Sequence, residues 1–295
     1  MNPAALPHRG AGKKFSGAYR QILRRAWLPA PVLLLLIFGL ALFAPATSYE
    51  SPLLVLTLNV VFSAFVSIAT VVVISRGFLH TGSLALLLLG CGALAWGLGG
   101  VTGVAVAMWG ADMEGVAPNI LVTVHNSSAW LSGAFHLAGA AVAQHGRMAW
   151  SARGRPLLLL LLYALVTVAV AGFAKVAVSG WTLTFFIPGE GGTLVRQAAL
   201  GSAIFMFLLT VLLLREGRYV SPFRLWYGNA LLMMAVGLLG LMLQMNTGSA
   251  LGWTGRTAMF IGGLFMLAAA FAANRERRKG HLELSRRVSV QTRYW

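Results

Sequence analysis

The chain has 295 residues, of which 58% are hydrophobic and only 10% are charged, and its mean hydropathy is +0.77. A soluble protein of this size carries about 25% charged residues because its surface must be hydrated, so this composition excludes a soluble globule. Lys and Arg number 23 against 7 Asp and Glu, a formal net charge of +16. In a soluble protein that excess would indicate nucleic acid, but these basic residues lie between long apolar runs. We therefore expect a membrane protein with no nucleic-acid partner.

Eight charge-free intervals alternate with short charged segments along the chain. A helix needs about 20 mainly apolar residues to cross a hydrocarbon core about 30 Å thick. We predict an all-α, polytopic bundle of eight transmembrane helices over residues 27–274. The helices are expected near residues 27–45, 52–75, 83–108, 119–143, 156–178, 196–214, 223–244 and 254–274.

The basic residues also predict the orientation of this bundle. Twenty of the 23 lie in the N-terminal segment, in alternate loops and in the C-terminal tail. The other loops hold the acidic residues Glu50, Asp112, Glu114 and Glu190. Only Arg196 and Arg256 lie near the edges of those loops. Because cytoplasmic segments carry the excess of Lys and Arg, we expect both termini to be cytoplasmic in a bacterial inner (plasma) membrane.

Both ends of the chain are predicted to contact anionic lipid at the cytoplasmic face. Residues 1–26 are not a cleavable signal peptide, because their basic region leads into a run long enough to span. Residues 10–25 form either a basic interfacial helix or only the positive charge that sets the orientation. Residues 275–295 read as a basic juxtamembrane tail, in which Gly280 weakens a continuous helix.

Polar side chains inside a membrane are costly, so function is sought there first. On the fourth predicted helix, His125, Ser128, Ser132 and His136 lie within about 80° of the circumference. The two histidines are about 16 Å apart along the axis. Asn126 lies on the adjoining flank of the same helix.

The second predicted helix carries a matching ridge of Asn59, Ser63 and Thr70. Both helices run from the outside to the inside of the membrane. We therefore expect the two ridges to meet across the bundle and to line a ligand-binding cleft.

Three interpretations of these residues stay open. Asn, Ser and Thr join helices by hydrogen bonds where small residues allow close approach, which makes the stripes packing features. His125 and His136 could each ligate a haem together with a methionine from another helix. The alternative function is accordingly a haem- or quinone-binding, or purely structural, subunit of a membrane complex. The third interpretation is a polar cleft that binds a small ligand, a proton or a quinone, because histidine titrates near neutral pH.

Three local features have structural explanations. Gly99 and Gly103 form a GxxxG pair that predicts tight helix packing. Lys175, near the outer end of the fifth helix, is expected to extend to the interface. The aromatic loop 180–194 is predicted to anchor at the interface, or else to cap the outer mouth of the bundle.

Nothing in the sequence indicates catalysis, so we do not expect an enzyme. All seven acidic residues lie at the rims of the predicted helices, which argues against paired-carboxylate and carboxylate-bridged metal chemistry. Cys91 is the single cysteine, so a disulfide and a cysteine metal site are excluded. Nucleotide-binding glycine loops, nucleophile elbows and zinc signatures are absent. The two halves share no convincing repeat, which argues against many transporter folds.

Three segments carry a resemblance to a known family. They read SRGFLHTGSLALLLLGCGALAWGLGG (75–100), VTVHNSSAWLSGAFHLAGA (122–140) and LGWTGRTAMFIGGLFMLAAAFAANRERR (251–278). Together with the order of the helices, they resemble the membrane-associated sensor (MASE-type) domains of bacterial histidine kinases and diguanylate cyclases. The resemblance covers nearly the whole chain as architecture with scattered residues.

The resemblance implies a sensory or ligand-binding module that passes a signal to the cytoplasm. Such sensors continue into PAS, kinase or cyclase domains, whereas this sequence stops at Trp295. We expect either an output domain outside this chain, a kinase or a cyclase, or a separate cytoplasmic signalling partner. A homodimer is left open.

Overall fold

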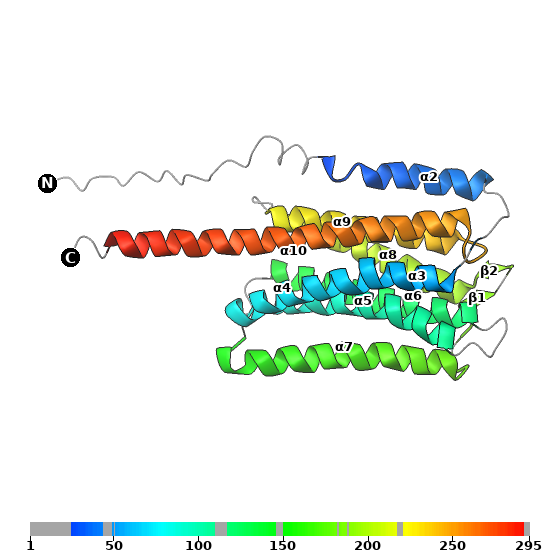
Figure 1. Cartoon of the computed structure of the whole chain (residues 1–295), viewed down its shortest axis with the longest axis horizontal. Helices are drawn as coiled ribbons and strands as arrows, with labels where there is room; N and C mark the ends of the chain where they lie inside the picture. The colour runs from blue at the N-terminus through cyan, green and yellow to red at the C-terminus, as the bar shows by residue number, and fades with distance from the viewer. Residues whose placement is uncertain are drawn as a thin grey trace.

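The computed structural model describes residues 25–43, 49, 51–109, 117–145, 150–181, 183–187, 189–216 and 221–291, with side chains as far as residue 275. Nearly all of the predicted N-terminal segment, residues 1–26, lies outside this part. The described residues form a bundle of eight helical rods, which confirms the all-α prediction (Figure 1).

Helices occupy all eight intervals that the sequence predicts. They are α2 (Pro29–Phe43), the continuous rod of α3 (Pro52–Asn59), the π-helical turn η1 (Val60–Phe65) and α4 (Val66–Thr81), then α5 (Leu84–Trp109), α6 (Ala117–Gln144), α7 (Arg155–Val178), α8 (Leu194–Arg215), α9 (Pro222–Leu243) and α10 (Ala250–Gln291). A 3-10 turn, η2 (Ala152–Gly154), precedes α7, and a short hairpin of β1 (Phe186–Ile187) and β2 (Gly191–Gly192) joins α7 to α8.

Six helical segments of the described chain are long and apolar enough to cross a membrane, as a multi-pass membrane protein requires: 53–81, 84–109, 152–178, 194–215, 222–243 and 250–275. The two remaining helices differ from these for separate reasons. α2 has 15 residues, about 22 Å at 1.5 Å per residue, which is shorter than the hydrocarbon core. α6 has 28 residues, but its amides, hydroxyls and histidines lower its hydropathy.

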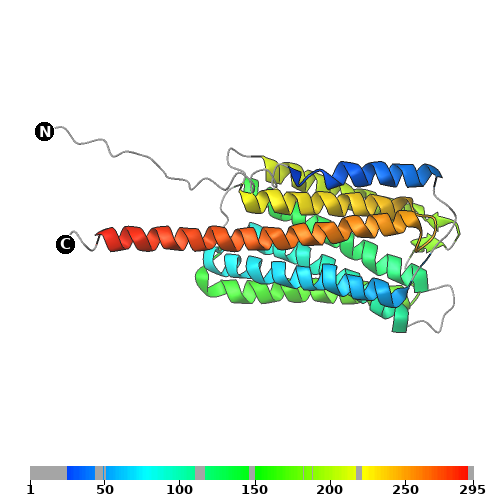
Figure 2. The same cartoon turned by 45° about the horizontal axis from the view of Figure 1, so that its top comes forward.

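Consecutive rods run antiparallel, so the loops gather at two ends of the bundle. We call the end that carries β1 and β2 the hairpin end. The opposite end, where α2 begins and α10 projects beyond the other helices, is the tail end (Figures 1 and 2).

Two central helices organise the packing. α5 contacts α4, α6 and α7, while α9 contacts α2, α8 and α10. The two groups are joined by α8, which packs on both α6 and α9, and by α10, which also packs on α4. α2 and α7 lie at opposite sides of the bundle (Figure 1) and leave large apolar side chains exposed, such as Phe43 and Leu160, as lipid-facing helices do.

The glycines of α5 let polar side chains of neighbouring helices reach its backbone. A Cβ added to Gly92 would lie 2.7 Å from the His136 ring of α6, and one added to Gly97 would lie 2.5 Å from Cβ of Ser67 in α4. The predicted tight packing of this helix is therefore confirmed.

This packing places α5 between the two polar ridges. Ser63 of η1 approaches Gly100 on one side of α5, and Ser128 of α6 approaches Gly99 on another side. The prediction that the ridges meet across the bundle is wrong along most of their length, because the side chains that were expected to meet contact the glycine-rich surface of α5 instead.

α10 is much longer than predicted. It continues for 42 residues to Gln291, so the expectation of a helix that ends near residue 274 is wrong. Gly280 costs only about 1 kcal/mol relative to alanine in a helix, and the surrounding Arg, Lys, Glu and Leu favour helix. The extension projects beyond the bundle at the tail end (Figure 1).

Candidate ligand-binding site

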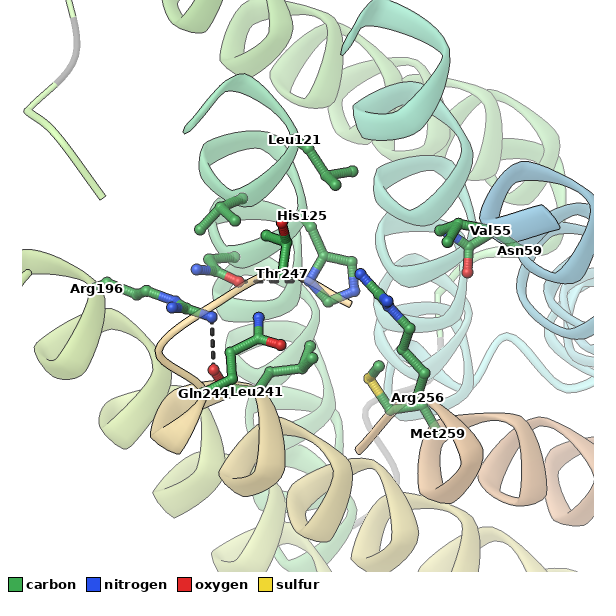
Figure 3. Close-up of a pocket in the computed structure, with 12 residues that line it drawn as sticks. Val55, Asn59, Leu121, His125, Arg196, Leu241, Gln244, Thr247, Arg256 and Met259 are labelled. Atoms are coloured by element: carbon green, nitrogen blue, oxygen red, sulfur yellow. Dashed lines mark hydrogen bonds between the residues drawn. The ribbon is translucent and has the colours of Figure 1, made fainter. Parts of the chain in front are cut away.

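A polar cavity of about 40 Å³ lies at the hairpin end, between α3, α6, α8, α9 and α10 (Figure 3). A cavity of this size has room for about three water molecules. We call it the arginine pocket. Its lining residues are Val55, Asn59, Leu121, Val122, His125, Asn126, Arg196, Leu241, Gln244, Thr247, Arg256 and Met259.

Arg196 enters the pocket from the first turn of α8 and is only 1% exposed. Its Nη2 atom donates a hydrogen bond of 2.5 Å to the carbonyl oxygen of Leu241 at the end of α9. Its guanidinium carbon lies 5.1 Å from the ring centroid of Phe186. The Nε and Nη1 atoms have no hydrogen-bond partner among the residues that the structure describes, so two donors of a buried cation are available.

Arg256 enters from the second turn of α10 and is 7% exposed. Its guanidinium carbon lies 5.0 Å from the ring of Trp253. That indole donates a 2.8 Å hydrogen bond to the carbonyl oxygen of Tyr49, whose N–H in turn donates to the carbonyl oxygen of Gly248. Figure 3 shows the two arginines reaching toward His125 from opposite sides.

The amide and imidazole groups come from the predicted polar ridges. The Nδ1 atom of His125 lies 3.4 Å from Oδ1 of Asn126, and Nδ2 of Asn126, a residue only 1% exposed, has no described partner. Asn59 donates from Nδ2 to the carbonyl oxygen of Gly100 at 2.8 Å. Gln244, from the loop after α9, is also buried, and its Oε1 lacks a partner in the described part of the chain.

The hairpin closes the bundle beside Arg196. The Oδ1 atom of Asn119 in α6 accepts hydrogen bonds from the backbone N–H groups of Phe185 and Phe186, at 2.9 and 3.1 Å. The ring of Phe186 is 2% exposed and lies against the guanidinium, whereas Trp181 in the same loop is 88% exposed. The aromatic loop thus contributes an inward-facing ring in addition to an outward-facing one.

Three of the eight residues singled out from the sequence line this pocket: Asn59, His125 and Asn126. The other five do not. They are the buried side chains of Ser63, Thr70, Ser128, Ser132 and His136, which pack within the bundle. Ser132, for example, donates from Oγ to the carbonyl oxygen of Gly92 at 2.8 Å.

His136 lies in an aromatic column rather than in a cleft. Its Nδ1 atom is 3.1 Å from the Tyr227 hydroxyl oxygen. Ring centroids follow one another at 5.2–6.0 Å from the arginine pocket toward the tail end, in the order His125, Trp96, Phe207, His136, Tyr227 and Phe223. The column therefore connects the two histidines through packed rings.

The two arginines and Gln244 were not predicted as site residues from the sequence. Arg196 and Arg256 were expected at loop edges, so Lys175 was the one cation expected in the interior. In the structure both arginines are buried, whereas the Lys175 side chain is exposed. One feature of the sequence could have identified them: both arginines lie on the acidic side of the predicted topology, where they do not help to orient the chain.

The pocket is suited to hydrogen-bond acceptors rather than to metals or large cofactors. It contains two guanidinium groups, and the described residues that line it include no carboxylate. Within the described ranges no three His, Cys, Asp or Glu side chains come together as a metal site. A haem is many times larger than the space beside His125, and Gly92, Phe207 and Tyr227 crowd the ring of His136, so neither histidine has room for one in this conformation.

Comparisons of this chain with protein-family models, with curated proteins and with solved structures found no match. The resemblance to MASE-type domains therefore stays a prediction, and the conclusions about function depend on the site itself.

Proposed function

We propose that this protein is a sensory or ligand-binding module of the bacterial inner membrane, and that the arginine pocket is its ligand site. Binding there changes how the helices pack, and α10 carries the change to a cytoplasmic output domain or partner protein. The positive-inside distribution supports placing the hairpin end outside and the tail end in the cytoplasm.

The observation that carries this proposal is the position of the pocket between two groups of helices. Asn59, His125 and Asn126 belong to helices that pack on α5, whereas Arg256 and Met259 lie on α10, which packs on α9. A ligand that contacts both groups favours one relative arrangement of them over another. Because α10 continues without interruption to Gln291, a shift in its first turns is conveyed along the helix.

The pocket favours ligand binding over a purely structural role. Buried polar atoms without partners cost free energy, and an interface selected only for packing would pair them or replace them. Instead, unpartnered atoms of Arg196, Asn126 and Gln244 surround one cavity. A ligand that pairs them would recover this cost.

The coupling is tested by filling the pocket from a helix other than α10. Val55 is 3% exposed and lines the cavity, so Val55→Phe places a ring in it. Val170→Phe, at a buried position of α7 outside the pocket, is the matched control for general overpacking. We expect Val55→Phe alone to change amide hydrogen exchange of residues 275–291 in full-length protein reconstituted in nanodiscs. Identical exchange in this region for Val55→Phe and Val170→Phe would show that the pocket and the tail are not coupled.

A further inference from the structure

We infer that the ligand of the arginine pocket is a small oxyanion, a carboxylate or a phosphate-type anion, held between Arg196 and Arg256. This inference rests on the proposed ligand-binding function and specifies the chemical class of the ligand. It follows from the donors, the charge and the size of the cavity.

Three donor atoms of residues that line the pocket have no partner in the described part of the chain. Arg196 offers Nε and Nη1, and Asn126 offers Nδ2, while both residues are 1% exposed. Arginine N–H groups form charge-assisted hydrogen bonds with the oxygens of a carboxylate or a phosphate. A cationic or purely apolar ligand would leave these donors without partners.

The two contacts that Arg196 already makes hold its guanidinium in place. Nη2 is held by the Leu241 carbonyl oxygen, and the ring of Phe186 covers the guanidinium. These two contacts set the orientation of the guanidinium before a ligand binds. A site organised in advance loses less entropy on binding.

The charge of the pocket points to the same class. Two guanidinium groups face one small cavity, and arginine stays protonated in proteins. Charges removed from water need opposite charge or hydrogen bonds to compensate for lost hydration. Arg196 forms no ion pair within the described part of the chain, and an oxyanion would supply the missing negative charge.

The remaining groups and the volume limit the ligand to a small one. The cavity of about 40 Å³ corresponds to about three waters, close to the bulk of acetate or phosphate and too small for an aromatic acid in this conformation. Gln244 also lines the cavity, and its side-chain amide carries an N–H₂ group that can donate to an oxyanion. The His125 imidazole, beside Asn126, can also donate from a ring nitrogen.

The test uses full-length protein in a maltoside detergent and phosphate-free buffer. Unfolding temperatures are measured with sodium acetate or sodium phosphate, at an ionic strength kept constant with sodium chloride. Acetamide, a neutral analogue of acetate, and choline, a cation, are the comparison solutes. We expect a saturable rise of about 3 °C or more with one oxyanion and none with acetamide or choline. The separate measurements with acetate and with phosphate show which of the two kinds of oxyanion binds.

The variants locate the site. Arg196→Gln and Arg256→Gln are each expected to weaken the oxyanion response at least about tenfold, since each removes one charged partner. Lys175→Gln is the matched control because Lys175 is an exposed cation near the same end. Asn126→Asp introduces a carboxylate into the pocket, so it should fold as well as the wild type and lose the oxyanion response. The inference is overturned if the oxyanion response persists in Asn126→Asp. It is also overturned if Lys175→Gln reduces the response as much as the two arginine variants do.

A carboxylate of the chain itself is the competing occupant. Glu50, Asp112 and Glu114 lie outside the described residues; in the sequence, Glu50 stands between α2 and α3, and Asp112 and Glu114 stand between α5 and α6. If the wild type does not respond to either oxyanion but the triple variant Glu50→Gln, Asp112→Asn, Glu114→Gln does, the pocket is filled internally and the inference fails. A response to acetamide or choline that Val55→Phe removes would also overturn it but leave the proposed ligand-binding function intact. With no response to any solute and no tail effect of Val55→Phe, both proposals fail.

Discussion

The Nδ1 atom of His136 lies 3.1 Å from the hydroxyl oxygen of Tyr227, and both side chains are fully buried. The same hydroxyl donates to the carbonyl oxygen of Leu89 at 3.3 Å. When Nδ1 carries the imidazole proton, it donates to the tyrosine oxygen and both contacts form together. The pair thus joins α6, α9 and α5 in the middle of the bundle.

We predict that Tyr227→Phe lowers stability by about 1 kcal/mol, since it removes the partner of a buried imidazole nitrogen. The measurement is the unfolding temperature of the purified protein in detergent. Tyr163→Phe is the control, because the hydroxyl of Tyr163 bonds the Oγ atom of Ser75 in a partly buried place, 2.9 Å away. Equal losses of stability in the two variants would mean that the buried hydrogen bond between Tyr227 and His136 contributes no more than the partly buried one between Tyr163 and Ser75.

Gly92→Ala is expected to destabilise the bundle by about 1–3 kcal/mol, because its Cβ would lie 2.7 Å from the His136 ring, and overpacked cores lose that much. Gly172→Ala is the matched control, as a Cβ there would meet nothing within 4 Å. The control should be neutral or slightly stabilising, since alanine favours helix. Unfolding temperatures measure both, and an unaffected Gly92→Ala would contradict the close approach of α5 and α6.

His125→Ala and His136→Ala are expected to have different effects. His125 lines the arginine pocket, so its removal should weaken the stabilisation by acetate or phosphate. His136 is 0% exposed and outside the pocket, so its removal should lower stability by about 2–4 kcal/mol, as large-to-small core changes do, with the oxyanion response retained. Thermal unfolding with and without oxyanion separates the two. The reverse pattern would place the ligand at His136.

Phe186→Leu keeps an apolar side chain on the hairpin and removes the aromatic face under Arg196. Cation–π contacts contribute about 0.5–2 kcal/mol, so we expect oxyanion affinity to fall several-fold. Leu183→Ala, at a position 69% exposed in the same loop, should leave the affinity unchanged. Calorimetric titration with acetate or phosphate measures both, and unaltered binding to Phe186→Leu would argue against a role of the ring in orienting Arg196.

Gly280→Pro is expected to interrupt α10 beyond the bundle, since proline costs about 3 kcal/mol inside a helix, whereas Gly280→Ala should strengthen the helix by about 1 kcal/mol. Amide hydrogen exchange of residues 281–291 reports the difference, with faster exchange in the proline variant and slower exchange in the alanine variant. Exchange that is fast in the wild type and the same in both variants would mean that the helix ends before residue 280.

The helices were predictable because charge-free apolar runs report directly on length and on burial in lipid. The long-range pairing was not, as the polar ridges of the second and fourth helices have the same residue types whether they face one another or the glycines of α5. Sequence period identifies a face of a helix, but it does not name the neighbour. The neighbour is identified only by the contacts of Gly92 with His136 and of Gly99 with Ser128, which exist only in the folded chain.

The site was partly predictable for a related reason. His125 and Asn126 stand out as polar groups within an apolar helix, so they are found by residue type alone. Arg196 and Arg256 lie within the first two turns of their helices, where a sequence gives no means to distinguish a buried cation from one that extends to the interface. Gln244 follows a helix end, and only the fold brings it to the same cavity.

The length of α10 has a mechanical consequence. Arg256 and Gln291 are separated by about 52 Å of helix at 1.5 Å per residue. If the helix pivots near the pocket, a tilt of only about 5° moves its far end by about 4.5 Å, close to the rise of one helical turn. α10 would thus act as a lever arm, with its short end in contact with the ligand and its long end free to reposition whatever adjoins it. A subtle rearrangement around a few atoms would be read out as a displacement large enough to make or break a protein contact.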